Sequence, residues 1–294
     1  MCESPLFAWR TIALALILSM PFSLPAMANH DDKPKPFGEL EYRSVGPAIG
    51  GRVTRVTGVA GDPLTWYFTA AQGGVWKSSN GGQAWEPIFD SQDNANIGSL
   101  ALAASEPSIL YVGAGEANIR GNVAQGTGIY KSTDAGKHWR KVWATSGQIG
   151  TMIVHPRDPD MVYAAVLGSP FGASKERGVY RSQDGGSTWQ RVLFKDELSG
   201  AADIAIDPTN PNILFASLWQ TKREPWHLRS GGPGSGLYRS LDGGNSWQPI
   251  TEHGLPSGEL GKIGVAVAPS NSKRMALLKT KWVKMLLFVD KPTI

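Results

Sequence analysis

The stretch Gly178-Val179-Tyr180-Arg181-Ser182-Gln183-Asp184-Gly185-Gly186-Ser187-Thr188-Trp189 decides the fold, because the chain repeats it three more times. Its core is Ser-x-Asp-x-Gly-x-x-Trp, and the four tryptophans are 50 to 58 residues apart. The first copy carries asparagine in place of the aspartate. The core residues are Ser78, Asn80, Gly82 and Trp85; Ser132, Asp134, Gly136 and Trp139; Ser182, Asp184, Gly186 and Trp189; Ser240, Asp242, Gly244 and Trp247.

The chemistry of this core indicates a tight hairpin turn. Aspartate and serine side chains can bond their own backbone in a turn, and glycine accepts a positive φ. The tryptophan supplies a large ring, which we expect to pack against the next repeat. We therefore interpret these residues as structural, rather than as metal ligands or catalytic groups.

The surroundings of each copy predict four short strands per repeat. Two apolar segments precede each core, such as Ile149 to Val154 and the run after Asp158-Pro159. A short apolar run such as Arg191-Val192-Leu193 follows it. Four strands in about 50 residues are typical of a β-propeller blade. We predict an all-β fold, a propeller of four-stranded blades that is incomplete at about four and a half blades.

Composition excludes several other classes. The 294 residues include 41% hydrophobic residues, 35 Gly and 11 Trp, enough for a folded core. The formal charge is +4, and much of the excess lies in the last residues, so nucleic acid is not an expected partner. The single cysteine, Cys2, rules out a disulfide framework, and the five histidines lack a ligand spacing. We expect no metal and no cofactor.

The first 28 residues resemble a secretory signal peptide. Arg10 precedes a short apolar run, and Ala26-Met27-Ala28 provides small residues for cleavage. The run is shorter than the ~20 residues that span a bilayer, so we expect no stable membrane span after cleavage. The alternative is a buried strand or an uncleaved anchor. We predict cleavage after Ala28, a linker over residues 29–41, and a secreted or periplasmic protein.

The loops between the second and third strands of each repeat carry the candidate site. Strand alternation places these loops, with those between repeats, on the face opposite the Ser-Asp turns, and their lengths vary most. Aromatic, arginine and asparagine side chains suit sugar rings or extended peptides. Loop-stabilising ion pairs and covered hydrophobic edges are the alternative. The candidates are Arg52, Glu116, Asn118, Arg120, Arg177, Trp219, Arg223 and Trp226.

The repeat core resembles the Asp-box, or BNR, motif. Further stretches, including Tyr42 to Arg52, Gly113 to Asn118 and Lys175 to Tyr180, are similar to secreted bacterial proteins with sortilin/Vps10-like propellers, often labelled BNR-repeat glycosyl hydrolases. The resemblance spans residues 42–278. It implies a propeller that binds peptides or proteins, as sortilin relatives do, or cleaves β-glucan, as xyloglucanase relatives do.

The residues favour binding over hydrolysis. Xyloglucanase-type propellers carry a catalytic aspartate where this chain has Ala71, and the Arg-Ile-Pro of sialidases is missing. A new carboxylate pair such as Glu116 with Asp93 is the remaining route to an enzyme. We therefore expect a binding module for protein, peptide or glycan ligands, with a glycoside hydrolase of xyloglucanase or sialidase type as the alternative.

The last residues depart from the repeat. A fifth repeat begins at Gly264, but no turn core follows Leu278. We interpret residues 279–294 as an aberrant tail from a frameshift or truncation, with a divergent last blade as the alternative. An incomplete ring leaves open edges, so we also expect self-association.

Overall fold

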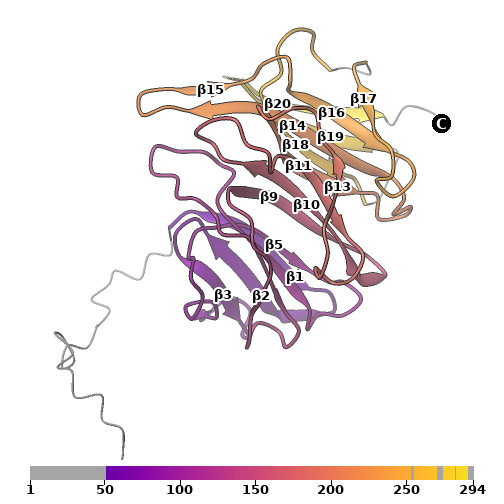
Figure 1. Cartoon of the computed structure of the whole chain (residues 1–294). Helices are drawn as coiled ribbons and strands as arrows, with labels where there is room; N and C mark the ends of the chain where they lie inside the picture. Colours follow the sequence, from indigo (N-terminus) through magenta and orange to yellow (C-terminus); the bar gives the residue numbers. More distant parts are fainter. Residues whose placement is uncertain (1–50, 253–254, 270–273, 282, 291–294) are drawn as a thin grey trace, which may run out of the picture. The chain divides into compact units, whose positions relative to one another are not determined.

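A computed structural model of the chain describes residues 51–252, 255–269, 274–281 and 283–290. These residues form twenty β-strands, and no helix occurs among them. The strands form antiparallel sheets that follow one another along the chain (Figure 1). The predicted signal peptide and linker, and the motif from Tyr42 to Gly50, lie outside the described residues.

Each repeat forms one sheet whose strands pair in chain order. The first sheet contains β1 (Val53–Val59), β2 (Asp62–Ala70), β3 (Gly74–Ser78) and β4 (Glu86–Pro87). The second contains β5 (Ile97–Leu102), β6 (Leu110–Ala114), β7 (Ile129–Ser132) and β8 (Arg140–Trp143). The third contains β9 (Gln148–His155), β10 (Asp158–Gly168), β11 (Gly178–Ser182) and β12 (Gln190–Leu193). The fourth contains β13 (Ser199–Ile206), β14 (Leu214–Arg223), β16 (Gly236–Ser240) and β17 (Gln248–Ile250), with β15 (Leu228–Ser230) paired to β14.

The fifth sheet has three strands, β18 (Lys262–Val267), β19 (Arg274–Lys281) and β20 (Val283–Asp290). The second strand extends past Leu278, and the chain that follows pairs along its whole length. The four complete sheets and the partial fifth confirm the predicted all-β, incomplete propeller. The tail therefore continues the fifth sheet as a hairpin, although it lacks the repeat core.

A β-bulge recurs at the same place in the first four sheets. The pairing of the first two strands shifts at Thr54, Gly98, Gly150 and Ala202. In the fifth sheet the corresponding pairing is regular. A bulge adds one residue to a strand and redirects the side chains beside it. The bulged positions also bring neighbouring backbones close, since a Cβ on Gly150 would clash with the carbonyl oxygen of Ala202.

The hydrophobic core lies between successive sheets rather than within one. Tyr67 and Val75 of the first sheet pack with Leu110 and Val112 of the second. Equivalent clusters join the second to the third sheet, the third to the fourth, and the fourth to the fifth. Each sheet thus buries its apolar faces against its neighbours, as repeat proteins do.

The predicted hairpin chemistry of the repeat core is confirmed. In the third copy, the Ser182 hydroxyl donates to Asp184 Oδ1 over 2.9 Å and accepts the Gly186 N–H over 2.8 Å. Asp184 Oδ1 also accepts the Thr188 N–H over 2.8 Å. Gly186 has a φ of 92°, which glycine adopts without strain. The other three copies repeat these bonds. In the first copy the amide oxygen of Asn80 takes the place of the carboxylate oxygen and accepts from the Ser78 hydroxyl and the Ala84 N–H.

The tryptophan of the core packs differently from our expectation. Trp189 stacks on Trp143 of the preceding sheet, with ring centroids 5.4 Å apart, and Trp139 donates its indole N–H to the carbonyl oxygen of Ile88. The expectation that this ring meets the next repeat was therefore wrong. The ring shares a sheet face with the tyrosine of the third strand, and Tyr180 also contacts Trp143.

We predict that Ser182→Ala lowers the free energy of unfolding by about 1–3 kcal/mol, because it leaves the buried Gly186 N–H without its acceptor. Urea denaturation of the full chain measures this change. Gln183→Ala is the matched control, since its side chain is exposed and it should change stability by less than ~0.5 kcal/mol. Equal losses in the two variants would contradict the role of the hydroxyl.

The core aspartates also predict how stability responds to acid. Hydrogen bonds from the hydroxyls and backbone N–H groups of Thr188 and Ser246 lower the pKa of Asp184 and of Asp242 to about 2. A carboxylate whose pKa falls on folding stabilises the fold above its unfolded pKa of ~3.9, and this contribution disappears as the pH falls through the folded pKa. Between pH 4 and pH 2 the protein should therefore lose stability more steeply than a variant with Asn at positions 134, 184 and 242. Parallel curves of unfolding free energy against pH would contradict this account.

Candidate functional site

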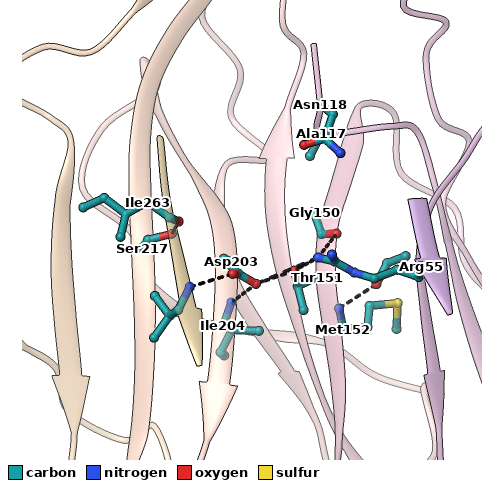
Figure 2. A network of polar contacts seen from close by, with 12 residues as sticks. Arg55, Ala117, Asn118, Gly150, Thr151, Met152, Asp203, Ile204, Ser217 and Ile263 are labelled. Carbon is teal, nitrogen blue, oxygen red and sulfur yellow. Dashed lines mark hydrogen bonds and ion pairs between the residues drawn. The ribbon is translucent and has the colours of Figure 1, made fainter. Parts of the chain in front are cut away.

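A polar network joins the five sheets through their first strands (Figure 2). The Ser99 hydroxyl of β5 accepts the N–H of Met152 in β9 over 2.7 Å. Arg55 of β1 donates to the carbonyl oxygen of Gly150 and to the hydroxyl of Thr151 in β9. The Thr151 hydroxyl donates to Asp203 Oδ1 in β13 over 2.5 Å. Asp203 Oδ2 accepts the N–H of Val265 in β18 over 2.8 Å. Arg55, Thr151 and Asp203 follow the recurring bulge in their strands, which explains why these side chains meet.

A cavity of about 300 Å³ adjoins this network. Arg55, Asp203 and Lys262 line it together with Asn118. The remaining wall is formed by small residues, Gly98, Ala117, Gly150, Ala202 and Gly264. The cavity is therefore small and charged, with backbone close to its surface.

A wider hollow of about 510 Å³ shares Asn118 and Lys262 with this inner cavity. Five of the eight sequence-predicted candidates line it, namely Arg52, Glu116, Asn118, Arg120 and Trp219. They come from the start of β1, the loop after β6, and β14. Val53, Ile119, Leu228, Ser230 and Lys262 complete the lining. We refer to these ten residues as the loop-face hollow.

An ion pair fixes one side of the loop-face hollow. Arg52 donates to Glu116 Oε2, whose side chain is only 4% exposed. The pair joins the first sheet to the loop of the second. Arg120 is exposed beside it, while Trp219 is 3% exposed and donates its indole N–H to the Ser230 hydroxyl.

Lys262 lines both the inner cavity and the loop-face hollow. Its ammonium donates to the carbonyl oxygen of Ala117 over 3.2 Å and to Asn118 Oδ1, and it lies 5.7 Å from the centre of the Trp219 ring. The pKa of Lys262 falls to about 8, chiefly because burial disfavours its charge; Asp203 and Glu116 oppose this fall, and Arg55 adds to it.

The structure places Arg177 in the protein interior instead of at a binding surface. The side chain is fully buried, and its guanidinium donates to the carbonyl oxygens of Ser169 and Gly172 over 2.8 and 3.0 Å. Burial lowers its pKa to about 10. Arg177 thus holds the loop after β10 in shape, and a ligand at the surface does not reach it.

Trp226 and Arg223 belong to the hairpin of β14 and β15 (Figure 1) and do not line the loop-face hollow, although Leu228 and Ser230 of the same hairpin do. Trp226 is 83% exposed in the turn of the hairpin. The Arg223 N–H donates to the carbonyl oxygen of Pro170, which fastens the hairpin to the loop after β10. The Arg223 guanidinium lies beside Gly121, so Arg223 borders the loop that carries Glu116, although neither Arg223 nor Trp226 lines the hollow.

Sequence reasoning missed Lys262, Arg55 and Asp203. Aligning the first strand of each repeat finds them. Arg55, Ser99, Thr151, Asp203 and Val265 share one position, and Arg52, Asn96, Gln148, Gly200 and Lys262 share another. At both positions the residue type changes from repeat to repeat, although the strands around them are regular. This change of residue type is the signal that could have identified Arg55, Asp203 and Lys262.

Residues 127–258 match the family model Sortilin-Vps10, described as sortilin, neurotensin receptor 3. No curated protein sequence matches the chain significantly. The family resemblance noted from the sequence is therefore confirmed over the matched residues.

Solved structures support the propeller fold. An ancestral GH74 enzyme superposes with a TM-score of 0.59 at 18% identity, covering 83% of this chain and 33% of that chain. The Niastella koreensis GH74 enzyme gives a TM-score of 0.59 at 22% identity, covering 77% and 33%. The Cps50 (Swd1) β-propeller domain of Myceliophteria thermophila gives 0.50 at 13% identity, covering 78% and 62%. The chain spans about a third of the length of the two GH74 enzymes, and these similarities concern the fold.

Among the described ranges, no helix has the length and apolar character needed to cross a bilayer.

We predict that Asp203→Ala lowers the free energy of unfolding by about 1–3 kcal/mol, because it leaves the Thr151 hydroxyl and the buried N–H groups of Ile204 and Val265 without their shared acceptor. Urea denaturation of the full chain tests this. Glu224→Ala is the control, since both side chains of its ion pair with Lys222 are more than a third exposed and its loss should cost about 0–1 kcal/mol. If Asp203→Ala cost no more than the control, the polar network would not support the fold.

Proposed function

We propose that this protein is an exported binding module that holds a peptide, protein or glycan ligand in the loop-face hollow. The observation that carries the proposal is that Arg52, the loop residues Glu116, Asn118 and Arg120, and Trp219 line one hollow, although they come from three separate segments of the sequence. A concave site with an aromatic edge and a few convergent polar groups is the usual form of a ligand site.

The charge of the hollow favours ligands with anionic groups. Arg52, Arg120 and Lys262 supply three cations, and Glu116 is the one acidic residue among the described lining residues. Glu116 is already paired with Arg52, so we expect the exposed Arg120 to meet an incoming carboxylate or sulfate. Arginine can bind such groups through two parallel hydrogen bonds.

The hollow is held in shape before any ligand arrives. The Arg52–Glu116 pair and the bonds from Lys262 to Ala117 and Asn118 tie the loop after β6 to the first and fifth sheets. A site that needs little ordering loses less free energy on binding.

Glycoside hydrolysis is the weaker alternative. Inverting hydrolysis needs two carboxyl groups about 6.5–9.5 Å apart, and retaining hydrolysis needs them about 5–5.5 Å apart. Asp93, the proposed partner of Glu116, is held by the Tyr130 hydroxyl and by Lys141 over 2.6 Å, and it does not line the hollow. Ala71, at the xyloglucanase position, is buried and has no carboxylate. We infer export from the signal peptide that the sequence predicts over residues 1–28.

We predict that Arg120→Ala weakens binding of anionic probes by about tenfold or more, the effect of losing one charge-assisted hydrogen bond. The probes are a set of acidic, neutral and basic hexapeptides, with cello-oligosaccharides and oligogalacturonates, measured by calorimetry on the full chain.

Arg157→Ala is the matched control, because Arg157 is an exposed arginine in the turn between β9 and β10, on the opposite face. Equal affinity of Arg120→Ala and wild type for every probe that binds would contradict the proposal. Sugar release from the oligosaccharides that is lost in Glu116→Gln would favour the hydrolase instead.

A further inference from the structure

We propose that three neighbouring loops on the loop face form a peripheral membrane-binding surface, which holds this protein on bilayers that contain anionic phospholipid. This goes beyond the proposed ligand site, because the surface lies outside the lining of the loop-face hollow and does not require that the hollow bind a ligand. The exposed apolar residues of the surface, which we call the apolar tips, are Phe171, Phe194, Leu198 and Trp226.

The loops that carry the apolar tips are hydrogen-bonded to one another. One loop follows β10, one joins β12 to β13, and one is the turn between β14 and β15. The Arg223 N–H donates to the carbonyl oxygen of Pro170 over 2.6 Å, which joins the turn's hairpin to the first loop. The Ser174 N–H donates to the carbonyl oxygen of Glu197 over 2.9 Å, which joins the first loop to the second. Because each of these groups lies within three residues of an apolar tip, the tips share one part of the loop face.

The turn that holds Trp226 is closely bonded and presents the indole ring to solvent. The backbones of Glu224 and His227 exchange hydrogen bonds of 2.8 and 3.2 Å, so Pro225 and Trp226 form a two-residue turn. Figure 1 shows the hairpin of β14 and β15 extending out from its sheet. An indole at such a position contributes little to the core. Its apolar ring and single N–H suit the boundary between lipid and water.

Positive charge surrounds the apolar tips. The three loop segments, residues 170–176, 191–198 and 222–229, contain six exposed or partly exposed cations and four carboxylates. Glu224 is paired with Lys222 over 3.0 Å, and Glu176 accepts from the Ser174 hydroxyl over 2.7 Å. The excess of two positive charges has the sign that an anionic lipid surface attracts. The six cations are Lys175, Arg191, Lys195, Lys222, Arg223 and Arg229.

The form of the surface favours a bilayer over a protein partner. The apolar tips stand on separate loops with lysine and arginine between them, and they line neither the inner cavity nor the loop-face hollow. A protein partner would have to match this uneven shape, because the centres of specific interfaces are packed as densely as protein interiors. A bilayer surface deforms around isolated apolar side chains, while lysine and arginine keep their charges at the headgroups.

The test is flotation of the full chain with vesicles of phosphatidylcholine alone or of phosphatidylcholine mixed equally with phosphatidylglycerol. We expect the partition coefficient to be higher by about tenfold or more for the mixed vesicles, and to fall as salt screens the lipid charge. Trp226→Ala should lower partition into the mixed vesicles about tenfold, because the indole is the largest apolar group that enters the lipid surface.

Two leucines of similar exposure provide a matched control. Leu198 is 50% exposed among the apolar tips. Leu64 is 54% exposed near the start of β2, where its carbonyl oxygen accepts the N–H of Gly81 in the first Ser-Asp turn, on the opposite face. Leu198→Ala should lower partition into the mixed vesicles about threefold, whereas Leu64→Ala should leave it unchanged. Urea denaturation checks that each variant is folded.

The two proposals fail separately. Trp226→Ala should bind the peptide and oligosaccharide probes as tightly as wild type, since Trp226 does not line the hollow. Absence of binding to the mixed vesicles, or equal partition of wild type, Trp226→Ala and Leu198→Ala, would overturn the membrane-binding surface. Loss of probe binding in Trp226→Ala with unchanged vesicle binding would also overturn it, and would assign the apolar tips to a soluble ligand.

Discussion

The packing of each sheet against its neighbour is the constraint on which the structure depends. A single four-stranded sheet of this chain cannot bury both of its apolar faces alone, and four of the hydrophobic clusters among the described residues each span two successive sheets, while another joins the second, third and fourth. Close approach of the first strands requires small residues at the bulges, such as Gly98 and Gly150. The polar network of Arg55, Thr151 and Asp203 then joins sheets that are not adjacent in the chain.

Most of the fold could be predicted from the sequence because its signal is local and repeated. The Ser-Asp turn needs only residues within one hairpin, so four copies define the strands around them. The direction in which Trp189 packs could not be read in this way, because it depends on which sheet face the neighbour covers. The strand pairing of β20 was also missed, since the tail carries no repeat core.

The candidate site was predicted in part. The loop positions of Glu116, Asn118 and Arg120 followed from the alternation of strands, and the structure brings them together. Arg177 looked similar in sequence but is buried, because its long side chain can reach three backbone carbonyl groups inside the protein. Lys262 escaped notice because its importance comes from contact with a loop far away in sequence.

The central claim is that ligands bind on the loop face and not on the face of the Ser-Asp turns. The most direct measurement is hydrogen–deuterium exchange of the full chain, with and without the tightest-binding probe of the peptide and oligosaccharide set. The account predicts slower exchange in residues 115–121 and 228–231, with no change in residues 183–188 of the repeat core. Protection confined to residues 183–188 and the equivalent turns would contradict it.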